Sequence, residues 1–400
     1  MGRARSADRA FFPLDEQLGL ASAGVTPRGQ EALVRLATWI SFEHACELLR
    51  ELLGIDVSAT SARRYTYQGG LAALAVQQAE QARLREDLPE PPKGAEQAVI
   101  SADGAFVPLL GGEWAEVKTL VVGEVVQNEE GEADTTSISS FSRLAEAESF
   151  SQQALVELHR RGVERAEAVC AVTDGAPWLQ GFIDEHCPQA LRILDFAHAA
   201  EYVSAMGQAA TEAGSVLGPT WLQERLHTLK HEGPRPVLSQ LRALQAQHLQ
   251  LPLLSEKLAY LEKRETHMQY PTYQAAGWPI GSGSVESANK LVVEARLKGA
   301  GRHWERAHVN PLLVLRNAVC NGRWSETWQA SVQERQRARR QHRQERTNRR
   351  LRLACWRVLV PVLRLQRLSA SSSPTRPPRY SWRQPFLRRP PASQNGSAKN

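Results

Sequence analysis

The sequence has few cysteines and no long hydrophobic run. Its five cysteines are scattered along the chain, and no two of them form a Cys-x-x-Cys pair. Neither a disulfide framework nor a zinc ribbon is therefore supported. The longest apolar runs, such as residues 358–363, are far too short to span a bilayer. There is also no secretory signal pattern. We therefore expect a reduced cytoplasmic protein that does not contact a membrane.

Acidic residues are almost absent from the end of the chain. From Ser331 onward there are 18 Lys and Arg but only 2 acidic residues, against 31 basic and 41 acidic residues before it. Such a cationic segment attracts an anionic polymer, because phosphate contacts release counterions. The alternative is a solvated extension without a partner. We expect residues 329–400 to form a basic, largely disordered tail.

Residues 1–88 have the periodicity of short helices. Leu33, Leu36, Ala37 and Ile40 share one helix face, and a second helix follows from residue 42 until Gly54 ends it. Ser58 can cap a third helix, which carries Arg63 and Arg64, and a polar helix is expected after it from about Gly70 to Asp87. Two helices around a glycine-containing turn, the second bearing arginines, are typical of a DNA-binding helix-turn-helix. An ordinary helical bundle has the same pattern and remains an alternative.

Beyond a proline-rich boundary, "LPEPPKG", the pattern changes from helices to strands. The segments "AVISADGAFVPL", "WAEVKTLVVGEVV" and "TTSISSFS" predict three strands, and a helix is expected over about 145–161. Two further strand-to-helix units follow in "AEAVCAVTDGAPWL" and "ALRILDFAHA". Residues 198–264 are helical in pattern. This order predicts an α/β domain with a mixed sheet.

Asp103 and Asp174 share a local design, since each follows an apolar strand and precedes a glycine. Ligands gather beyond the carboxyl ends of strands in open α/β sheets. Two carboxylates brought together there would repel each other unless a cation neutralised them, and Mg²⁺ prefers oxygen ligands. The alternative is that each Asp-Gly pair simply makes a turn.

Glu286 is the third candidate. It follows the flexible segment Gly281–Gly283, in the first turn of a predicted helix that Ser284 could cap. Glu286 and Lys290 are also spaced as a surface ion pair, and Glu294 and Lys298 repeat that spacing. Spacing alone does not choose between the two glutamates.

Five segments in order resemble one known family. They are "ISADGAFVPL", "VTDGAPWL", "LDFAHAAEYV", "GWPIGSGSVESANKLVVEARLKGAGRHW" and "LRNAVCNGRW". Together they are similar to bacterial insertion-sequence DDE transposases of the ISKra type, relatives of the mutator-like group, over about residues 11–328. The resemblance implies an RNase H-like catalytic domain over 95–328, with a helical insertion at about 199–264. It also implies that Asp103, Asp174 and Glu286 form the catalytic metal site, which holds two Mg²⁺ ions or Mn²⁺ in their place.

The same resemblance points to supporting residues. Asp195 and His198 match a D-x-x-H motif of similar transposases. His198 could orient Asp195, contact phosphate or assist the metal shell, although a buried Asp–His hydrogen bond with a structural role is an equal alternative. Contacts to DNA phosphates and single strands are expected from the basic segment after Glu286, which contains Arg296, Lys298, Arg302 and Trp304. Ordinary surface charge and a core Trp are the alternative there.

The expected function is therefore cleavage and joining of DNA at the ends of a mobile element. Water attacks a phosphodiester first, and the 3′-hydroxyl that is released then attacks target DNA. The expected partners are terminal inverted repeats, target DNA and further copies of the chain, in a dimer or larger assembly associated with the nucleoid. A DNA-binding regulator or inactive remnant that does not cut, and an RNase H-like nuclease that cuts without joining, are the alternatives.

Overall fold

The computed structural model describes residues 25–87 and 89–369, with side-chain environments as far as residue 353. The chain divides into two units, residues 1–337 and 338–400, and each is described by itself. In the described part of the chain, no helix is both long enough and apolar enough to cross a membrane.

The centre of the first unit is a mixed sheet of five strands in the order β3-β2-β1-β4-β5. β1 pairs antiparallel with β2 and parallel with β4, while the outer pairs β2–β3 and β4–β5 are antiparallel and parallel respectively. The strand bounds are β1 Gln97–Pro108, β2 Trp114–Gln127, β3 Ala133–Leu144, β4 Ala168–Thr173 and β5 Leu191–Leu194. The mixed α/β class predicted from the sequence is confirmed.

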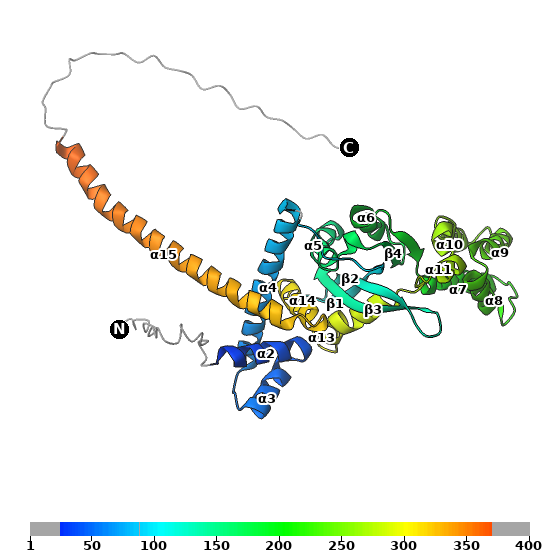
Figure 1. Ribbon diagram of the computed structural model, residues 1–400, viewed down its shortest axis with the longest axis horizontal. Helices are drawn as coiled ribbons and strands as arrows, with labels where there is room; N and C mark the ends of the chain where they lie inside the picture. Colours follow the sequence, from blue (N-terminus) through cyan, green and yellow to red (C-terminus); the bar gives the residue numbers. More distant parts are fainter. Residues whose placement is uncertain (1–24, 88, 370–400) are drawn as a thin grey trace, which may run out of the picture. The chain divides into compact units, whose positions relative to one another are not determined.

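Helices cover both faces of the sheet (Figure 1). On one face, α5 (Ala147–Arg160) and α6 (Pro177–His186) pack Phe150 and Phe182 against Ile100 and Leu120. On the other face, the apolar side chains of β1 and β2 meet α14 (Arg306–Cys320) and the helical segment that precedes it. Successive strand residues alternate between these two cores, as the pleat requires.

The N-terminal helices pack on α14. α2 (Pro27–Trp39) begins at Thr26, whose hydroxyl accepts from the Gly29 N–H, with proline at the first helical position. α3 (Phe42–Leu53) begins at Ser41 and ends at Gly54, which has a left-handed φ of 64°. Both boundaries follow the expected capping chemistry.

The third N-terminal helix is longer than the sequence suggested. A separate polar helix was expected from about residue 70, but α4 runs without a break over Ala59–Asp87. The pair Gly69 and Gly70 does not end the helix, because α14 and α15 pack closely against α4 at these two residues. A β-carbon on Gly70 would collide with the backbone of Pro311 in α14, and one on Gly69 would lie 3.2 Å from the Trp328 ring.

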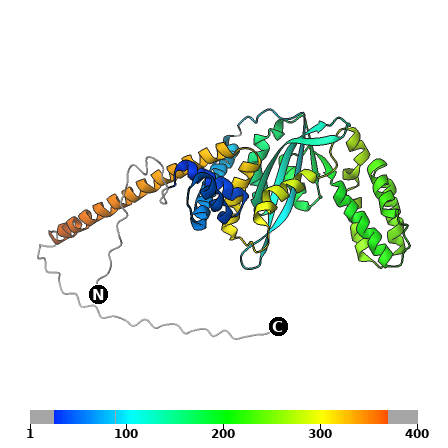
Figure 2. The same cartoon turned by 90° about the horizontal axis from the view of Figure 1, so that it is seen from below.

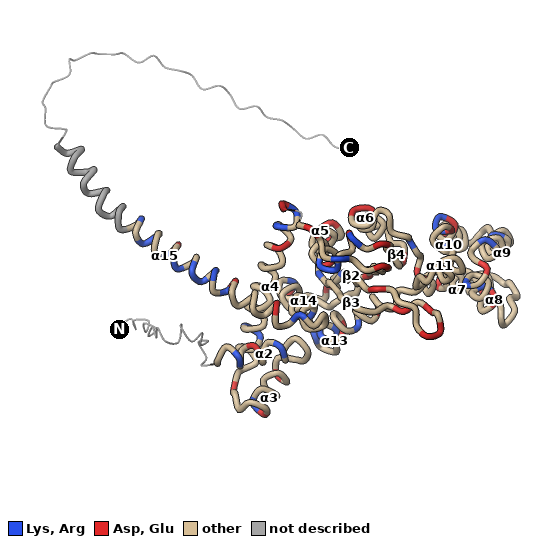
Figure 3. Tube along the Cα trace, in the orientation of Figure 1, with Lys and Arg blue, Asp and Glu red and all other residues tan. Residues whose placement is uncertain are grey.

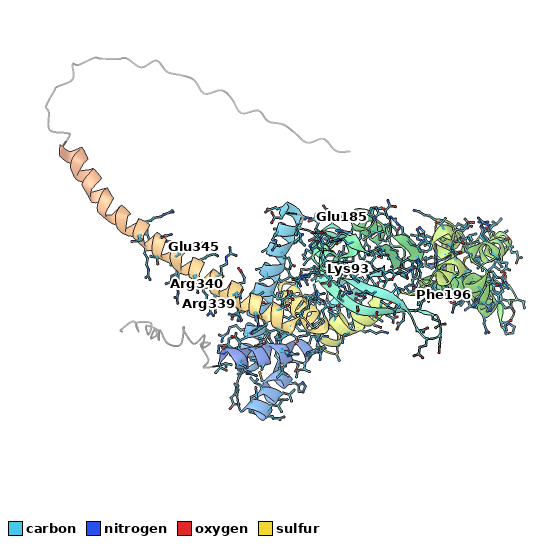
Figure 4. The ribbon with its side chains drawn as sticks, viewed as in Figure 1. Lys93, Glu185, Phe196, Arg339, Arg340 and Glu345 are labelled. Carbon is cyan, nitrogen blue, oxygen red and sulfur yellow. The ribbon has the colours of Figure 1, made fainter. Side chains whose placement is uncertain are left out.

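A helical module separates β5 from the helices that return to the sheet. Its elements are α7 Phe196–Glu212, α8 Trp221–His231, α9 Pro234–Gln247, α10 Pro252–Glu262, η2 Glu265–Met268 and α11 Tyr270–Ala275. The module shares one core with β4 and β5 and lies at the opposite end of the sheet from α2 and α3 (Figure 2). Phe196 marks the junction, where its ring packs edge-on against Tyr270 (Figure 4).

After the module, the chain returns along the sheet as one helical run. It comprises α12 (Gly283–Ala288), a π-helical turn η3 (Asn289–Glu294) and α13 (Ala295–Leu297). Val285 and Ala288 of α12 pack on Val121 of β2. The sequence motif that contains Glu286 therefore lies on a helical run that passes beside β1.

The last helix, α15 (Trp324–Ser369), departs from the expectation of a largely disordered tail over 329–369. The segment is rich in Arg, Gln and Leu and has no glycine, so helix propensity favours this result. In the second unit, all side chains over 338–353 are exposed. They include Arg339, Arg340 and Glu345, and basic residues dominate this stretch (Figures 3 and 4). Residues 370–400 of the expected tail lie outside the described residues.

Candidate metal and nucleic-acid site

Asp103 lies within β1 and not at its end. The strand was expected to stop at Asp103-Gly104, but residues 104–108 remain paired with β2. The parallel partner β4 does end at this level. The β1–β4 pairs run as far as Ile100 with Ala171, and the same register continued by three residues sets Asp103 opposite Asp174. The open edge of β1 beyond β4 is therefore where the two aspartates meet.

Asp174 is held by its own loop and by the helical module. Its Oδ1 accepts from the Ala176 N–H at 2.8 Å. The Tyr260 hydroxyl of α10 donates to the Asp174 carbonyl, and Arg264 Nη2 donates to the Gly175 carbonyl at 2.6 Å. Gly175 has a φ of 76°, and a β-carbon there would strike Arg264 and Tyr260. The module thus fixes the backbone that carries the second aspartate.

The charges of the two carboxylates interact. Burial raises the pKa of the Asp103 carboxyl, and the negative charges of Asp174 and Glu116 raise it further. Hydrogen bonds from the Gly104 N–H, at 2.7 Å, and from Asn289 act in the opposite direction. The net pKa lies above the usual value for Asp, which is the signature of a partly buried carboxylate beside other negative charges.

Asn289 is a site residue that the sequence analysis missed. Its Nδ2 donates to Asp103 Oδ2 at 3.0 Å, while the residue itself is only 5% exposed. Its buried Oδ1 has no hydrogen-bond partner among the described residues. A buried amide oxygen without a partner is costly unless a donor or cation completes it. The available signal was its position one turn after Glu286, but a neutral amide does not stand out by charge.

Glu286 is brought near this site by its helix but is not joined to it by its side chain. The side chain is 64% exposed and forms an ion pair with Lys290 at 2.6 Å, which lowers the pKa of Glu286. Among the described residues, no three His, Cys, Asp or Glu side chains are grouped to hold a metal. Glu286 therefore forms the surface ion pair that its spacing from Lys290 also allowed. Its role as the third carboxylate remains a prediction.

Asp195 is buried, and both of its carboxylate oxygens accept hydrogen bonds from backbone N–H groups. It caps α7 by accepting from the His198 N–H at 3.0 Å, and its other oxygen accepts from the Ser282 N–H at 2.8 Å. It therefore ties the end of β5 to the loop that leads into α12. The His198 ring does not bond Asp195; it packs against the rings of Tyr202 and Tyr260. The Asp–His side-chain hydrogen bond considered from the sequence is therefore not formed, and the supporting roles of both residues remain predictions.

A family model covers most of the sequence. It is described as an uncharacterised protein family, UPF0236, and it matches residues 3–336. The chain belongs to this family. No curated protein matches the sequence. In this UPF0236 protein the matched region contains the described helices and strands from α2 to α14 and the start of α15, together with every candidate site residue.

The predicted DNA-contacting residues of this UPF0236 chain lie in different environments. Arg63 and Arg64 are exposed on α4. Lys298 pairs with Glu294, as spacing allowed. Arg302 Nη1 donates to the Arg296 carbonyl at 3.1 Å.

Arg296 departs from the expected exposed phosphate contact. It is only 2% exposed, and its Nε donates to the Ala37 carbonyl at 3.0 Å. Its guanidinium lies 5.0 Å from the ring centroids of both Phe42 and Trp304. Hydrophobic packing of α2 and α3 over the helical run buries it, which local sequence could not indicate.

Proposed function

We propose that this protein is a metal-dependent DNA transposase that cleaves and joins DNA at the ends of a mobile element. The observation that carries the proposal is that the β1–β4 register, continued past its last pair, sets Asp103 opposite Asp174, and that the charge of Asp174 helps to raise the pKa of Asp103. Carboxylates held so close are the usual means of binding a hard cation beside a phosphodiester.

The topology supports the same proposal. A sheet in the order β3-β2-β1-β4-β5, with β1 to β3 antiparallel and β4 and β5 parallel to β1, is the arrangement expected of an RNase H-like domain. The helical module over 196–275 lies between the second aspartate and the Glu286 helix, where the resemblance to ISKra-type transposases puts an insertion.

The donor set fits Mg²⁺, which is commonly held by one or two protein carboxylates together with water and phosphate oxygens. Asp103 and Asp174 supply the carboxylates, and the unpaired Oδ1 of Asn289 supplies a neutral oxygen beside them. Glu286 would complete the set by leaving Lys290. Bound Mg²⁺, in two ions, would neutralise charge and activate the attacking oxygen in an in-line phosphodiester reaction.

The remaining residues position this set. Tyr260 and Arg264 hold the backbone of Asp174 and Gly175, and Asp195 anchors the loop that starts α12. The reaction would open a P–O bond with water and release a 3′-hydroxyl. That hydroxyl would then form a new P–O bond with target DNA as a target hydroxyl leaves. No covalent bond between protein and DNA is needed.

DNA would be engaged through α2–α4 as a helix-turn-helix, and through the arginines of α15. A dimer or larger assembly would bring two element ends together. Inverted repeats that flank the coding region provide the DNA substrate for the test. The wild-type protein should cleave this DNA only with Mg²⁺ or Mn²⁺, and Asp103→Asn should abolish cleavage while DNA binding persists.

Asp134→Asn is the matched control, because Asp134 is exposed and its side chain accepts a hydrogen bond from the Thr135 N–H, which Asn can also accept. Normal cleavage by Asp103→Asn would overturn the assignment. Cleavage without strand joining would instead indicate an RNase H-like nuclease.

A DNA-binding regulator that does not cut is the second candidate. The exposed ion pair of Glu286 with Lys290 favours it, since the third carboxylate is then engaged elsewhere. Specific binding to the element ends, with no cleavage under any metal condition, would select this function.

A further inference from the structure

A cavity lies away from Asp103 and Asp174, where the N-terminal helices meet the segment after α13. It has a volume of about 430 Å³, within the usual range of small-molecule pockets. The start of α3, one face of α4, the loop 301–305 and the start of α14 form its wall. It is therefore built from both parts of the first unit that the sequence associated with DNA.

The cavity carries an excess of positive charge that the protein does not neutralise. Arg63, Arg296 and Arg302 line it, and within the described residues none of the three forms an ion pair with a carboxylate. The Nη2 of the buried Arg296 has no hydrogen-bond partner there. Burial, followed by the charge of Arg302, lowers the pKa of Arg296 to about 10. A buried guanidinium with one donor left unpaired is costly, so this wall favours an anionic ligand.

Two acidic residues temper the charge without cancelling it. Glu305 lies at the cavity but is engaged by His308, at 3.2 Å between Nδ1 and Oε2. Glu43 is exposed at the start of α3. The N-terminus of α3, a helix of 12 residues, adds further positive potential.

The cavity also has an aromatic wall. The rings of Tyr67 and His308 are stacked, with centroids 3.8 Å apart and planes 10° from parallel. Phe42 meets Tyr67 edge-on, and both Phe42 and Trp304 flank the Arg296 guanidinium. Flat rings beside guanidinium groups are the combination that binds single-stranded nucleic acid, because bases stack on the rings and phosphates contact the arginines.

The position of the cavity relates it to the carboxylates. Asn289, which donates to Asp103, and Arg296, which lines the cavity, belong to the same helical run and are seven residues apart. At roughly 1.5 Å per residue this corresponds to about 10 Å along the helix. A few nucleotides of one DNA strand cover that distance, because the rise is about 3.4 Å per nucleotide in the duplex.

We propose that this cavity holds an unstacked nucleotide of single-stranded DNA, with its base on the Tyr67–His308 stack and its phosphate among Arg63, Arg296 and Arg302. The inference rests on the proposed function for its biological substrate, because strand separation near Asp103 would supply the single strand. It assigns the cavity a role distinct from both metal binding and duplex recognition.

The test measures binding of a fluorescein-labelled 12-nucleotide oligothymidylate to the full chain in EDTA, so that no cleavage occurs. Arg63→Ala should weaken binding by about fivefold or more, and should reduce the slope of log affinity against log salt by about 0.7, as loss of one single-strand phosphate contact does. Lys93→Ala is the control for loss of one exposed positive charge, since Lys93 lies between α4 and β1, is exposed and does not line the cavity. Its effect should stay within about twofold.

Substitutions at Tyr67 separate stacking from charge. Tyr67→Phe keeps the ring and should keep the affinity, whereas Tyr67→Leu should weaken binding by about fivefold or more with the salt slope unchanged. Equal losses in Arg63→Ala and Lys93→Ala, or equal affinities in Tyr67→Phe and Tyr67→Leu, would overturn the proposal.

Cleavage is scored separately with Mg²⁺. Oligothymidylate binding that depends on Arg63 and Tyr67, in a chain that never cleaves, would refute the transposase and leave the cavity assignment standing. Asp103-dependent cleavage with binding indifferent to Arg63 and Tyr67 would do the reverse.

Discussion

The ionised side chain of Asp103 destabilises the folded protein. Its carboxyl is partly buried, lies beside Asp174 and accepts hydrogen bonds from Gly104 and Asn289. Two donors do not offset the burial and repulsion, so the pKa remains raised. A carboxyl with a raised folded pKa destabilises the fold in its ionised form, and such residues concentrate at functional sites.

Asp103→Asn should therefore stabilise the metal-free protein at neutral pH, by roughly 0.5–2 kcal/mol, the usual range of stabilising substitutions. The gain should be present above the folded pKa of Asp103. It should fade as the pH falls through that pKa, because the wild-type carboxyl then becomes neutral. Thermal unfolding of both proteins across pH 4 to 8, in EDTA, measures this. A wild type more stable than Asp103→Asn at neutral pH contradicts the electrostatic description.

Glu286 and Glu294 offer a comparison within one helical run. Each forms an i,i+4 ion pair with a lysine, so both neutral variants lose the same kind of surface contact. Such pairs contribute only about 0.3–0.5 kcal/mol. Glu286→Gln should reduce DNA cleavage by more than the roughly 10- to 100-fold typical of residues that only orient ligands. Glu294→Gln should retain nearly full cleavage. Equal rates for the two variants would leave Glu286 as a surface residue.

At the scale of elements, the contact between α4 and α14 joins the N-terminal helices to the sheet domain. α14 packs on β3 through Asn310, Asn317 and Asn321, which bond the backbone of residues 140–144. On its other side the helix meets α4 at Gly70, where only hydrogen fits against the Pro311 backbone. Glycine in a helix usually weakens it, so here close packing decides the residue.

Gly70→Ala should accordingly destabilise the protein by about 1–3 kcal/mol, since backbone cannot move aside as a flexible side chain does. Gly181→Ala is the control within α6. Gly181 is exposed, and a β-carbon there meets nothing within 4 Å. That variant should gain up to about 1 kcal/mol from helix propensity. Denaturant unfolding of both proteins tests the pair, and a neutral Gly70→Ala would mean that the two helices do not pack this closely.

Much of the element order could be predicted because it depends on local signals. Thr26, Ser41 and Gly54 mark helix ends by capping chemistry, and the β-branched runs mark strands. The errors occurred where distant contacts prevailed over local ones. β1 continues past Asp103 because β2 pairs with it, and α4 continues past Gly70 because α14 covers it.

For the whole molecule, the sequence indicated the two aspartates but not their full surroundings. Strand-end patterns brought Asp103 and Asp174 together, and their register agrees. Asn289 was missed because a neutral amide carries no charge signal, and the burial of Arg296 follows from the packing of α2 and α3. The choice of Glu286 came from family resemblance, which its ion pair with Lys290 does not test.

The central claim is that Asp103 and Asp174 form one cation site, and Mn²⁺ binding followed by electron paramagnetic resonance tests it most directly. Wild-type protein should bind Mn²⁺, and Asp103→Asn and Asp174→Asn should each weaken binding by about tenfold or more, because each removes a charged ligand. Asp134→Asn should bind as the wild type does. Mn²⁺ affinity unchanged by either site substitution would contradict the account.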